Sequence, residues 1–197
     1  MKRIAILFSF LLLTIVTLAQ DHASFKGIPI NGTLDSFTAK LKAQGFTLVE
    51  SESGIATLKG TFAAVSNSKI YVVSTNNLVW KVVVEFPRVS TWVAAVKSYN
   101  EFKESFSKKY ETNSLVKEYF PEGYSGSPDD SYFKRSEMYD ALKKETAKWD
   151  STFPIPGGMA VVRIIPAFED YSYFRVVLEY YDWVNTEARD KAVIDDI

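Results

Sequence analysis

The chain has 197 residues, of which 47% are hydrophobic and 15% aromatic, and its formal net charge is −1 at pH 7. This length is enough for one well-packed domain and short for two. The absence of cysteine excludes disulfides, thiolate metal sites and a cysteine nucleophile, and the near-neutral charge gives no basic footprint for nucleic acid.

Residues 1–19 predict a secretory signal peptide. Two basic residues precede an apolar run from Ile4 to Val16, and Ala19 places a small residue at the expected cut. An uncleaved anchoring helix is the alternative, but this run is short for a membrane span. We therefore expect cleavage before Gln20 and one soluble, exported domain, residues 20–197, in the periplasm or outside the cell. Because no cysteine is available to carry a lipid, we do not expect a lipoprotein.

The first stretch of the exported domain predicts a helix followed by two strands. An extended segment is expected first, and Thr33 is then a typical cap for a short helix that Gly45 ends. Strands are expected at 47–50 and 55–63. Gly60, inside the second strand, indicates a bulge or a close approach by the first helix.

The strongest periodic signals follow, in a hairpin of two strands. A turn at 66–68 leads into segments 70–75 and 79–86, which are rich in β-branched residues and flank the turn-forming pair Asn76-Asn77. The second segment alternates strictly, which predicts one face packed on the core and one face directed outward. The expected core face consists of Trp80, Val82, Val84 and Phe86, and the opposite face of Val79, Lys81, Val83 and Glu85.

A long amphipathic helix is expected after Pro87, beginning at Ser90 or Thr91 and ending near Lys109. Its apolar positions recur every three or four residues and form one stripe. We expect this stripe to pack on the Trp80 face of the sheet as part of the core. The stripe consists of Trp92, Val96, Tyr99, Phe102 (or Lys103), Phe106 and Tyr110.

The last part of the chain predicts further strands and two short helices. Residues 111–135 are polar and contain glycine and proline, so a loop with one short strand is expected there. The expected elements are a strand at 115–120, a helix at 136–144, strands at 147–155, 159–165 and 171–182, and a helix from Asn185.

This order of elements predicts an α+β fold, an antiparallel sheet of about six to eight strands with helices packed on one face. The chain divides into two halves, each a helix followed by a meander of strands. One interpretation is a diverged duplication. The match between the halves is topological and does not extend to the residues.

Several segments of the exported domain carry a family resemblance. They are Phe25 to Thr33, Gly45-Phe46, Leu58 to Phe62, Trp80 to Val82, the helix from Trp92 to Tyr110, and Val177 to Asp182. These segments resemble those of small exported proteins of unknown function in Bacteroidetes. The helix-and-meander outline is similar to that of β-lactamase-inhibitor proteins and small outer-membrane-assembly lipoproteins. The resemblance implies no catalytic residue, and the missing lipid-carrying cysteine departs from the lipoproteins.

The sequence offers no constellation of catalytic or metal-binding residues. His22 is the only histidine, and it lies beside the expected cleavage point, where a flexible terminus would give it no orienting partner. Zinc therefore lacks ligands, and the stretches Gly123 to Ser127 and Asp129-Asp130 are typical of a solvated loop. A carboxylate pair for glycoside hydrolysis stays open, because the separation of two carboxylates is a three-dimensional property. We expect no cofactor and no metal.

The outward row of the last strands is the one feature that points to a function. It combines tyrosine, arginine and apolar residues, the mixture favoured at recognition surfaces. A sheet with helices on one face would expose this row, whereas residues 111–135 or a second copy of the chain would cover it. The candidate binding residues are Lys81, Arg163, Tyr171, Tyr173, Arg175 and Tyr181.

Three functions remain open from the sequence. The leading hypothesis is a non-enzymatic binding module of the bacterial envelope that holds a protein partner with the outer sheet face or with the loop at 124–132. The alternative is a binder of carbohydrate or cell-wall fragments that uses tyrosine and tryptophan as stacking platforms, and the third is a hydrolase with unrecognised carboxylates. The expected partner is an envelope protein or a glycan, with no nucleic acid and no transmembrane segment after signal cleavage, and the oligomeric state is open.

Overall fold

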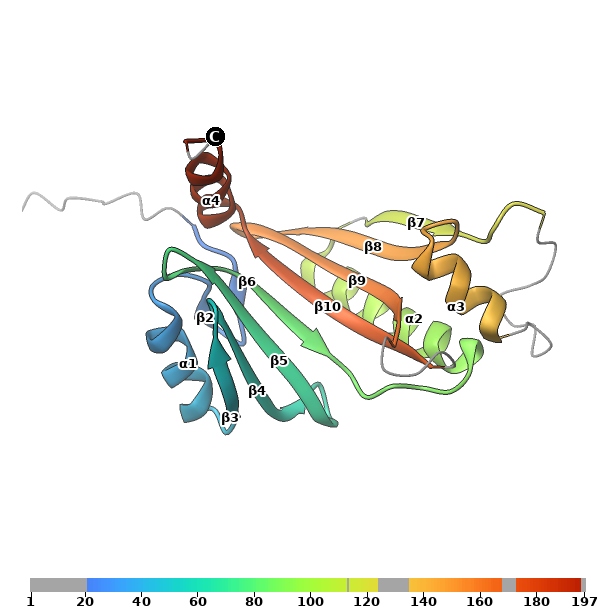
Figure 1. The fold of residues 1–197 in the computed structure, drawn as a ribbon, viewed down its shortest axis with the longest axis horizontal. Coiled ribbons are helices and arrows are strands. Elements are labelled where there is room, and N and C mark those ends of the chain that lie inside the picture. Colours follow the sequence, from blue (N-terminus) through green and yellow to red (C-terminus); the bar gives the residue numbers. More distant parts are fainter. Residues whose placement is uncertain (1–20, 113, 124–134, 168–172, 196–197) are drawn as a thin grey trace, which may run out of the picture.

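The computed structural model describes residues 21–112, 114–123, 135–167 and 173–195. It confirms the expected α+β class, because eight strands form one antiparallel sheet and four helices pack against it (Figure 1). Two short strands, β1 (Ser24–Phe25) and β2 (Ile28–Pro29), form a separate hairpin. The sheet contains β3 (Thr47–Glu52), β4 (Ile55–Phe62), β5 (Val65–Thr75), β6 (Leu78–Glu85), β7 (Leu115–Tyr119), β8 (Lys148–Ile155), β9 (Gly158–Pro166) and β10 (Phe174–Asp182). The helices are α1 (Leu34–Ala43), α2 (Trp92–Tyr110), α3 (Arg135–Lys143) and α4 (Trp183–Asp195).

The strand order of the sheet is β3-β4-β5-β6-β10-β9-β8-β7, so each half of the chain runs from one edge of the sheet to its centre. Helix α1 precedes the meander β3 to β6 and helix α2 precedes β7 to β10, so each half is a helix followed by four strands, with α3 inserted after β7. The last strands of the two halves meet at the centre, where Val84 pairs with Leu178. The arrangement agrees with the two expected helix-plus-meander halves and leaves β3 and β7 as the edges.

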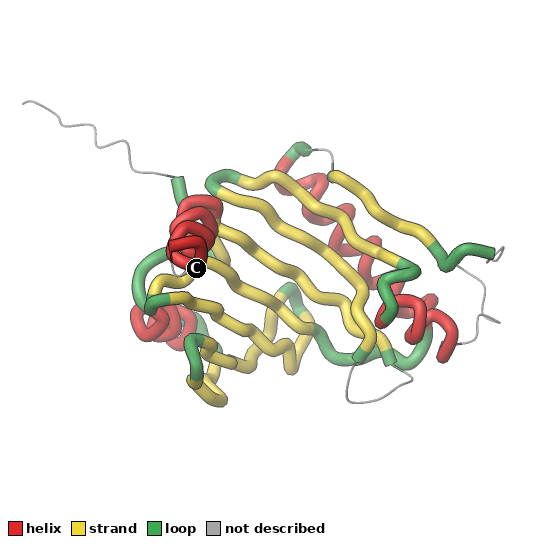
Figure 2. Tube along the Cα trace, turned by 45° about the horizontal axis from the view of Figure 1, so that its top comes forward, coloured by secondary structure: helices red, strands yellow, loops and turns green. Residues whose placement is uncertain are grey.

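The inner face of the sheet is the face against which α1 and α2 pack (Figure 2). The hydroxyl of Thr91 caps α2 by accepting a hydrogen bond of 3.2 Å from the backbone N–H of Ala94, in the first turn of the helix. Along the helix, Trp92 lies edge-on to Trp149 with ring centroids 4.9 Å apart, and Phe106 lies 5.5 Å from Phe153. Full burial of a side chain of this size stabilises the fold by about 1.5–3 kcal/mol. The apolar stripe predicted for this helix is confirmed as core.

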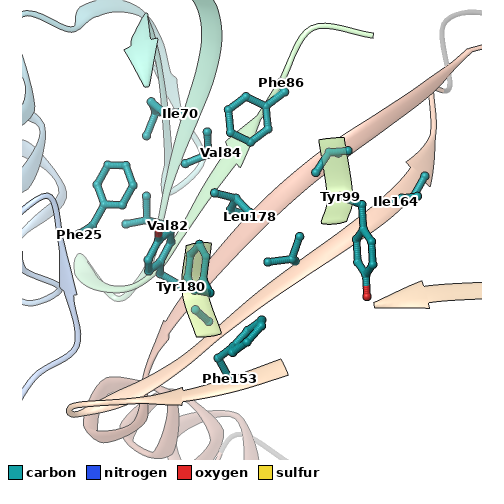
Figure 3. Packing of buried hydrophobic residues seen from close by; sticks show 14 of the residues in the cluster. Phe25, Ile70, Val82, Val84, Phe86, Tyr99, Phe153, Ile164, Leu178 and Tyr180 are labelled. Carbon is teal, nitrogen blue, oxygen red and sulfur yellow. The ribbon is translucent and has the colours of Figure 1, made fainter. Parts of the chain in front are cut away.

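The N-terminal segment is part of the core on the same inner face. The ring of Phe25 in β1 lies 5.3 Å from that of Phe62 in β4. It also lies 5.2 Å from the ring of Tyr180 in β10 (Figure 3). Phe25 therefore touches strands of both halves. The segment covers the inner face of the sheet where the two halves meet, and the pairing of β1 with β2 fixes its conformation.

The expected alternation of 79–86 is interrupted by a β-bulge. The register between β5 and β6 shifts at this point, and Val79 and Lys81 pair with successive residues of β5, so that Trp80 is extra. Val79 is fully buried in the core, and the ring of Trp80 lies 6.1 Å from that of Tyr181 on the opposite face. The prediction that Trp80 faces the core and Val79 faces outward was wrong, because a strict period of two cannot reveal an inserted residue.

Of two turns in the first half of the chain, one was predicted from the sequence and the other was not. Asn76 and Asn77 both have positive φ, 50° and 61°, which confirms the turn predicted between β5 and β6. The preceding turn was expected at 66–68 and instead consists of Ala63 and Ala64, with φ of 48° and 65°. Alanine carries no composition signal for left-handed backbone, so β5 begins earlier than predicted.

Gly60 confirms the close approach predicted for it. A Cβ atom on Gly60 would lie 2.5 Å from the ring of Phe46, the residue that follows α1 and its terminal turn. The register between β4 and β5 also shifts just after this glycine, so a bulge and a close contact occur together.

Helices α3 and α4 lie at opposite ends of the sheet. Helix α3 lies beside β8 and β9, at the end of the sheet away from α4 (Figure 1). Helix α4 follows β10 directly and packs against β6. Helix α4 begins at Trp183, two residues before the start that we expected. Within the described residues, no helix has both the length and the apolar character needed to cross a membrane.

Candidate functional site

The outer face of the sheet is the face opposite α1 and α2. Lys81 pairs with Tyr181 across β6 and β10, and Arg163 pairs with Val177 across β9 and β10. Side chains two positions apart on one strand share a face. Four of the predicted binding residues, Lys81, Arg163, Arg175 and Tyr181, therefore lie together on the outer face.

The two remaining tyrosines of the prediction have different positions. Tyr173 lies immediately before β10, and its ring centroid is 4.4 Å from the guanidinium carbon of Arg88. This geometry is a cation–π contact at the end of the outer row. Tyr171 lies outside the described residues, as does the loop at 124–132 that was the alternative binding surface.

Glu179 is the centre of one polar network on the outer face. Its carboxylate accepts a hydrogen bond from Lys81 Nζ at 3.0 Å and from the Tyr181 hydroxyl at 2.8 Å, and Arg163 lies 3.6 Å away. The residue is only 8% exposed. Burial by itself raises the pKa of Glu179, but the charges of Arg163 and Lys81 outweigh it and hold the pKa below its ordinary value. Glu179 is therefore ionised and fixed at neutral pH.

Glu85 is the centre of a second network nearby. Its carboxylate is held by the guanidinium of Arg175, lies 3.5 Å from Lys69 Nζ, and accepts a hydrogen bond of 3.4 Å from the Tyr71 hydroxyl. Burial, and then the charge of Glu85, raise the pKa of Tyr71. The phenol therefore remains a hydrogen-bond donor at neutral pH.

The floor beneath these networks is apolar. Val161 and Val177 are only 4% and 3% exposed, yet they do not belong to the main core cluster. They lie on the outer face, and Val177 and Val161 pair directly with Arg163 and Glu179. Long charged side chains cover apolar surface with their stems. The outer face is thus sealed by its own ordered polar side chains.

The aromatic rings at the α4 end of the outer face are engaged by cations. Lys81 Nζ lies 4.6 Å from the ring centroid of Tyr181, and the guanidinium carbon of Arg189 lies 4.1 Å from that of Trp80. Trp80 reaches this position only because of the bulge in β6. Burial raises the pKa of Tyr181, so this phenol also remains protonated.

A buried cluster around Asp182 corrects the expectation for His22. His22 Nδ1 lies 3.0 Å from Asp182 Oδ2, and the fully buried Asp182 also accepts the N–H groups of Ala23 and Asn185 at 2.8 Å. The Asn185 amide donates to the carbonyls of Ile30 and Val79. His22 is therefore oriented by a carboxylate and is not on a flexible terminus. Most bonds of the cluster satisfy backbone groups, which indicates a structural clamp.

The sequence predicted the cations and tyrosines of the outer face but missed the acids that organise them. Glu85 and Glu179 were placed in the outward rows, yet neither was named as a site residue. Their role depends on which residues pair across β6, β10 and β9. Opposite charges in facing rows are a signal once that register is known.

Neither a metal site nor a known relative assigns a chemistry to this face. The described part of the chain contains no group of three or more His, Asp or Glu side chains that could hold a metal ion. No family model, no curated protein and no solved structure matches the chain. Its function is therefore inferred from the outer face itself.

Proposed function

We propose that the protein is an exported, non-enzymatic binding module whose outer face holds a protein partner. The observation that carries the proposal is the pair of ordered networks around Glu179 and Glu85, on the face opposite α1 and α2 (Figure 2). Side chains that are already ordered lose little conformational freedom on binding, which favours affinity. Tyrosine and arginine are also the residues that most often dominate binding energy at protein interfaces.

The electrostatics of the face favour binding over catalysis. A general acid in glycoside hydrolysis needs a carboxyl group with a raised pKa. The pKa of Glu179 is shifted in the opposite direction. Glu85 lies between two cations. These carboxylates therefore resemble structural anchors for cations more than proton donors.

The arrangement of the aromatic rings favours a protein partner over a glycan. A sugar-stacking platform needs uncovered ring faces that lie side by side, but Trp80 and Tyr181 each stack on a cation of this chain. Among the described residues, the exposed rings are those of Trp183 and Tyr119. The strand registers place these two rings at opposite ends of the sheet, so they do not form one platform.

A capture experiment with matched variants tests the proposal. Envelope extract is passed over the chain without residues 1–19 and over a variant with Tyr173→Ala, Arg175→Ala and Tyr181→Ala. The control variant carries Lys97→Ala, Asn100→Ala and Glu104→Ala, three exposed positions on α2. Circular dichroism and thermal unfolding establish that all three proteins are folded.

The proposal predicts a polypeptide that is captured by the parent and by the α2 variant and is lost from the outer-face variant. Equal capture by all three proteins would contradict a role for the outer face. Capture of a glycan without a protein, reproduced as sugar-dependent quenching of tryptophan fluorescence, would show that the ligand is a carbohydrate and not a protein.

A further inference from the structure

A pocket opens at one end of the outer face, where the end of α3 meets β8 and β9. Its volume is about 280 Å³, and its walls include Leu142, Trp149 and Ile165. A cavity of roughly 150 Å³ holds one benzene ring, and sites for whole small molecules start at about 300 Å³. The pocket therefore fits one large apolar side chain better than a cofactor or an oligosaccharide.

Arg163 lines this pocket with an incompletely satisfied guanidinium group. Its Nη2 atom lies 3.6 Å from Glu179 and 4.0 Å from Asp150, both longer than a charge-assisted hydrogen bond. Its Nε atom is buried and has no hydrogen-bond partner among the described residues. The Arg163 side chain is 36% exposed, so its loosely paired Nη atoms can receive a further carboxylate, whose geometry matches the guanidinium fork.

The surroundings of Arg163 carry an excess of positive charge. Asp150 has three cations around it: Lys148 Nζ lies 3.2 Å away, Arg163 lies on the neighbouring strand, and Lys117 pairs with Asp150 across β7 and β8. A second acid of the pocket wall, Glu145, is accompanied by Lys143. The side chains of Lys148 and Arg163 are partly exposed.

A smaller excess of cations holds for the strands of the whole outer face. With the edge strand β3 included, the acids in the outward rows are Glu50, Glu52, Glu85, Asp150 and Glu179, and the cations are Lys59, Lys69, Lys81, Lys117, Lys148, Arg163 and Arg175. The whole chain has 23 Lys and Arg against 24 Asp and Glu. The outer face is thus basic on a chain that is nearly neutral, and this asymmetry attracts an acidic partner.

We propose that the outer face recognises an acidic polypeptide segment that places one large apolar side chain in the pocket beside Arg163. This inference rests on the proposed function and specifies the partner. Carboxylates next to the inserted side chain meet Arg163, Lys148 and Lys117, while the apolar walls receive the side chain itself. The pocket supplies position, and the cations supply selectivity for acidic sequence.

A polypeptide fits this surface better than a nucleic acid. Nucleic-acid binding depends on cations that neutralise successive phosphates. Here Glu85, Asp150 and Glu179 stand between the cations, and the floor between them is valine. A chain of mixed acidic and apolar residues matches that alternation, whereas a uniform polyanion would face three acids.

Binding of defined short peptides, followed by fluorescence anisotropy at low salt, tests the inference. The first peptide has aspartate and glutamate on both sides of a central phenylalanine. A second replaces the phenylalanine by alanine, a third replaces the acids by asparagine and glutamine, and a fourth replaces them by lysine. Single-stranded DNA and a heparin fragment serve as polyanions without apolar side chains.

Three protein variants accompany the probes. Lys117→Gln with Lys148→Gln lowers the charge at the pocket, and Lys97→Gln with Lys108→Gln lowers it equally on α2. Arg163→Met removes the guanidinium but keeps a stem over the valine floor. Thermal unfolding shows that each variant is folded.

We expect the acidic phenylalanine peptide to bind, and the other three peptides to bind at least about tenfold more weakly. The pocket variants should lose about tenfold in affinity for this peptide, and the α2 variant should lose none. Binding of acidic and neutral peptides alike, or equal binding of DNA and heparin, would overturn the inference. If no peptide binds although the outer face still captures a protein from extract, the inference fails and the proposed function stands.

Discussion

The two faces of the central sheet are built from the same strands but are buried by different means. The inner row of β10 lies under aromatic rings from α2 and from the N-terminal segment, and the outer row lies among charged side chains. Both rows contain residues that are almost fully buried. The inner row is Phe174, Val176, Leu178 and Tyr180, and the outer row is Arg175, Val177, Glu179 and Tyr181. Burial of an apolar floor therefore does not require a second layer of structure when long charged side chains are held in place by acids.

The comparison predicts the largest loss of stability on the inner face. Trp92→Ala removes a ring that packs against Trp149 and Phe174 at centroid distances of 4.9 and 5.5 Å. Deleting a buried tryptophan side chain leaves a cavity, so we expect the free energy of unfolding to fall by about 3–5 kcal/mol. Urea unfolding measures it. A loss below about 1 kcal/mol would mean that the inner layer does not carry the stability of the sheet.

A smaller loss is expected when the outer face loses its central acid. Glu179→Gln leaves Lys81 and Arg163 without the charge that holds them over the valine floor. Because these groups are partly exposed and can regain water, we expect a loss of about 1–3 kcal/mol, below the value for a fully buried pair. The same urea titration, with Glu101→Gln on the exposed side of α2 as control, measures the effect. Equal values for the two variants would show that the network is not ordered in solution.

The outer network also predicts a pH dependence that the packing around Trp92 lacks. The pKa of Glu179 is lower in the folded chain than its ordinary value of 4.5. Its stabilising contribution is therefore complete above about pH 4.5 and is lost as the pH falls through the lower pKa of the folded state. The stability difference between the parent and Glu179→Gln should be constant near neutral pH and shrink in acid. Trp92→Ala should show no such change, and a difference that grows in acid would contradict the assignment.

The smallest effect is expected from a single hydroxyl. Tyr181→Phe removes the hydrogen bond to Glu179 but keeps the ring beside Lys81 and Trp80. A bond to a charged acceptor at a half-buried site contributes about 0.5–1.5 kcal/mol, and we expect a loss in that range. Thermal unfolding measures it. A larger loss than that of Glu179→Gln would place the centre of the network on Tyr181.

The fold was predictable where the residues themselves carry the signal. The stripe from Trp92 to Tyr110, the cap at Thr91 and the Asn76-Asn77 turn all follow from spacing and local backbone preference. The bulge at Trp80 and the turn at Ala63-Ala64 do not, because neither changes the composition of its segment.

The candidate site was predictable only in part, because it depends on which strands are neighbours. Alternation in single strands was enough to place Lys81, Arg163 and Arg175 outward. These residues come together only because β6 and β10 are neighbours at the centre of the sheet. That pairing is a property of the whole strand order, and no single segment of the sequence indicates it. The pocket beside Arg163 needs α3 as well, so no local pattern could reveal it.

The most direct test of the central claim is site-specific photo-crosslinking in envelope extract. A benzophenone amino acid replaces Tyr181 on the outer face in one protein and Lys97 on α2 in another, and both are irradiated under the same conditions. The outer-face position is predicted to form a covalent adduct with a polypeptide that is absent from the α2 position. The same adducts from both positions, or adducts from α2 alone, would contradict the assignment of the outer face as the recognition surface.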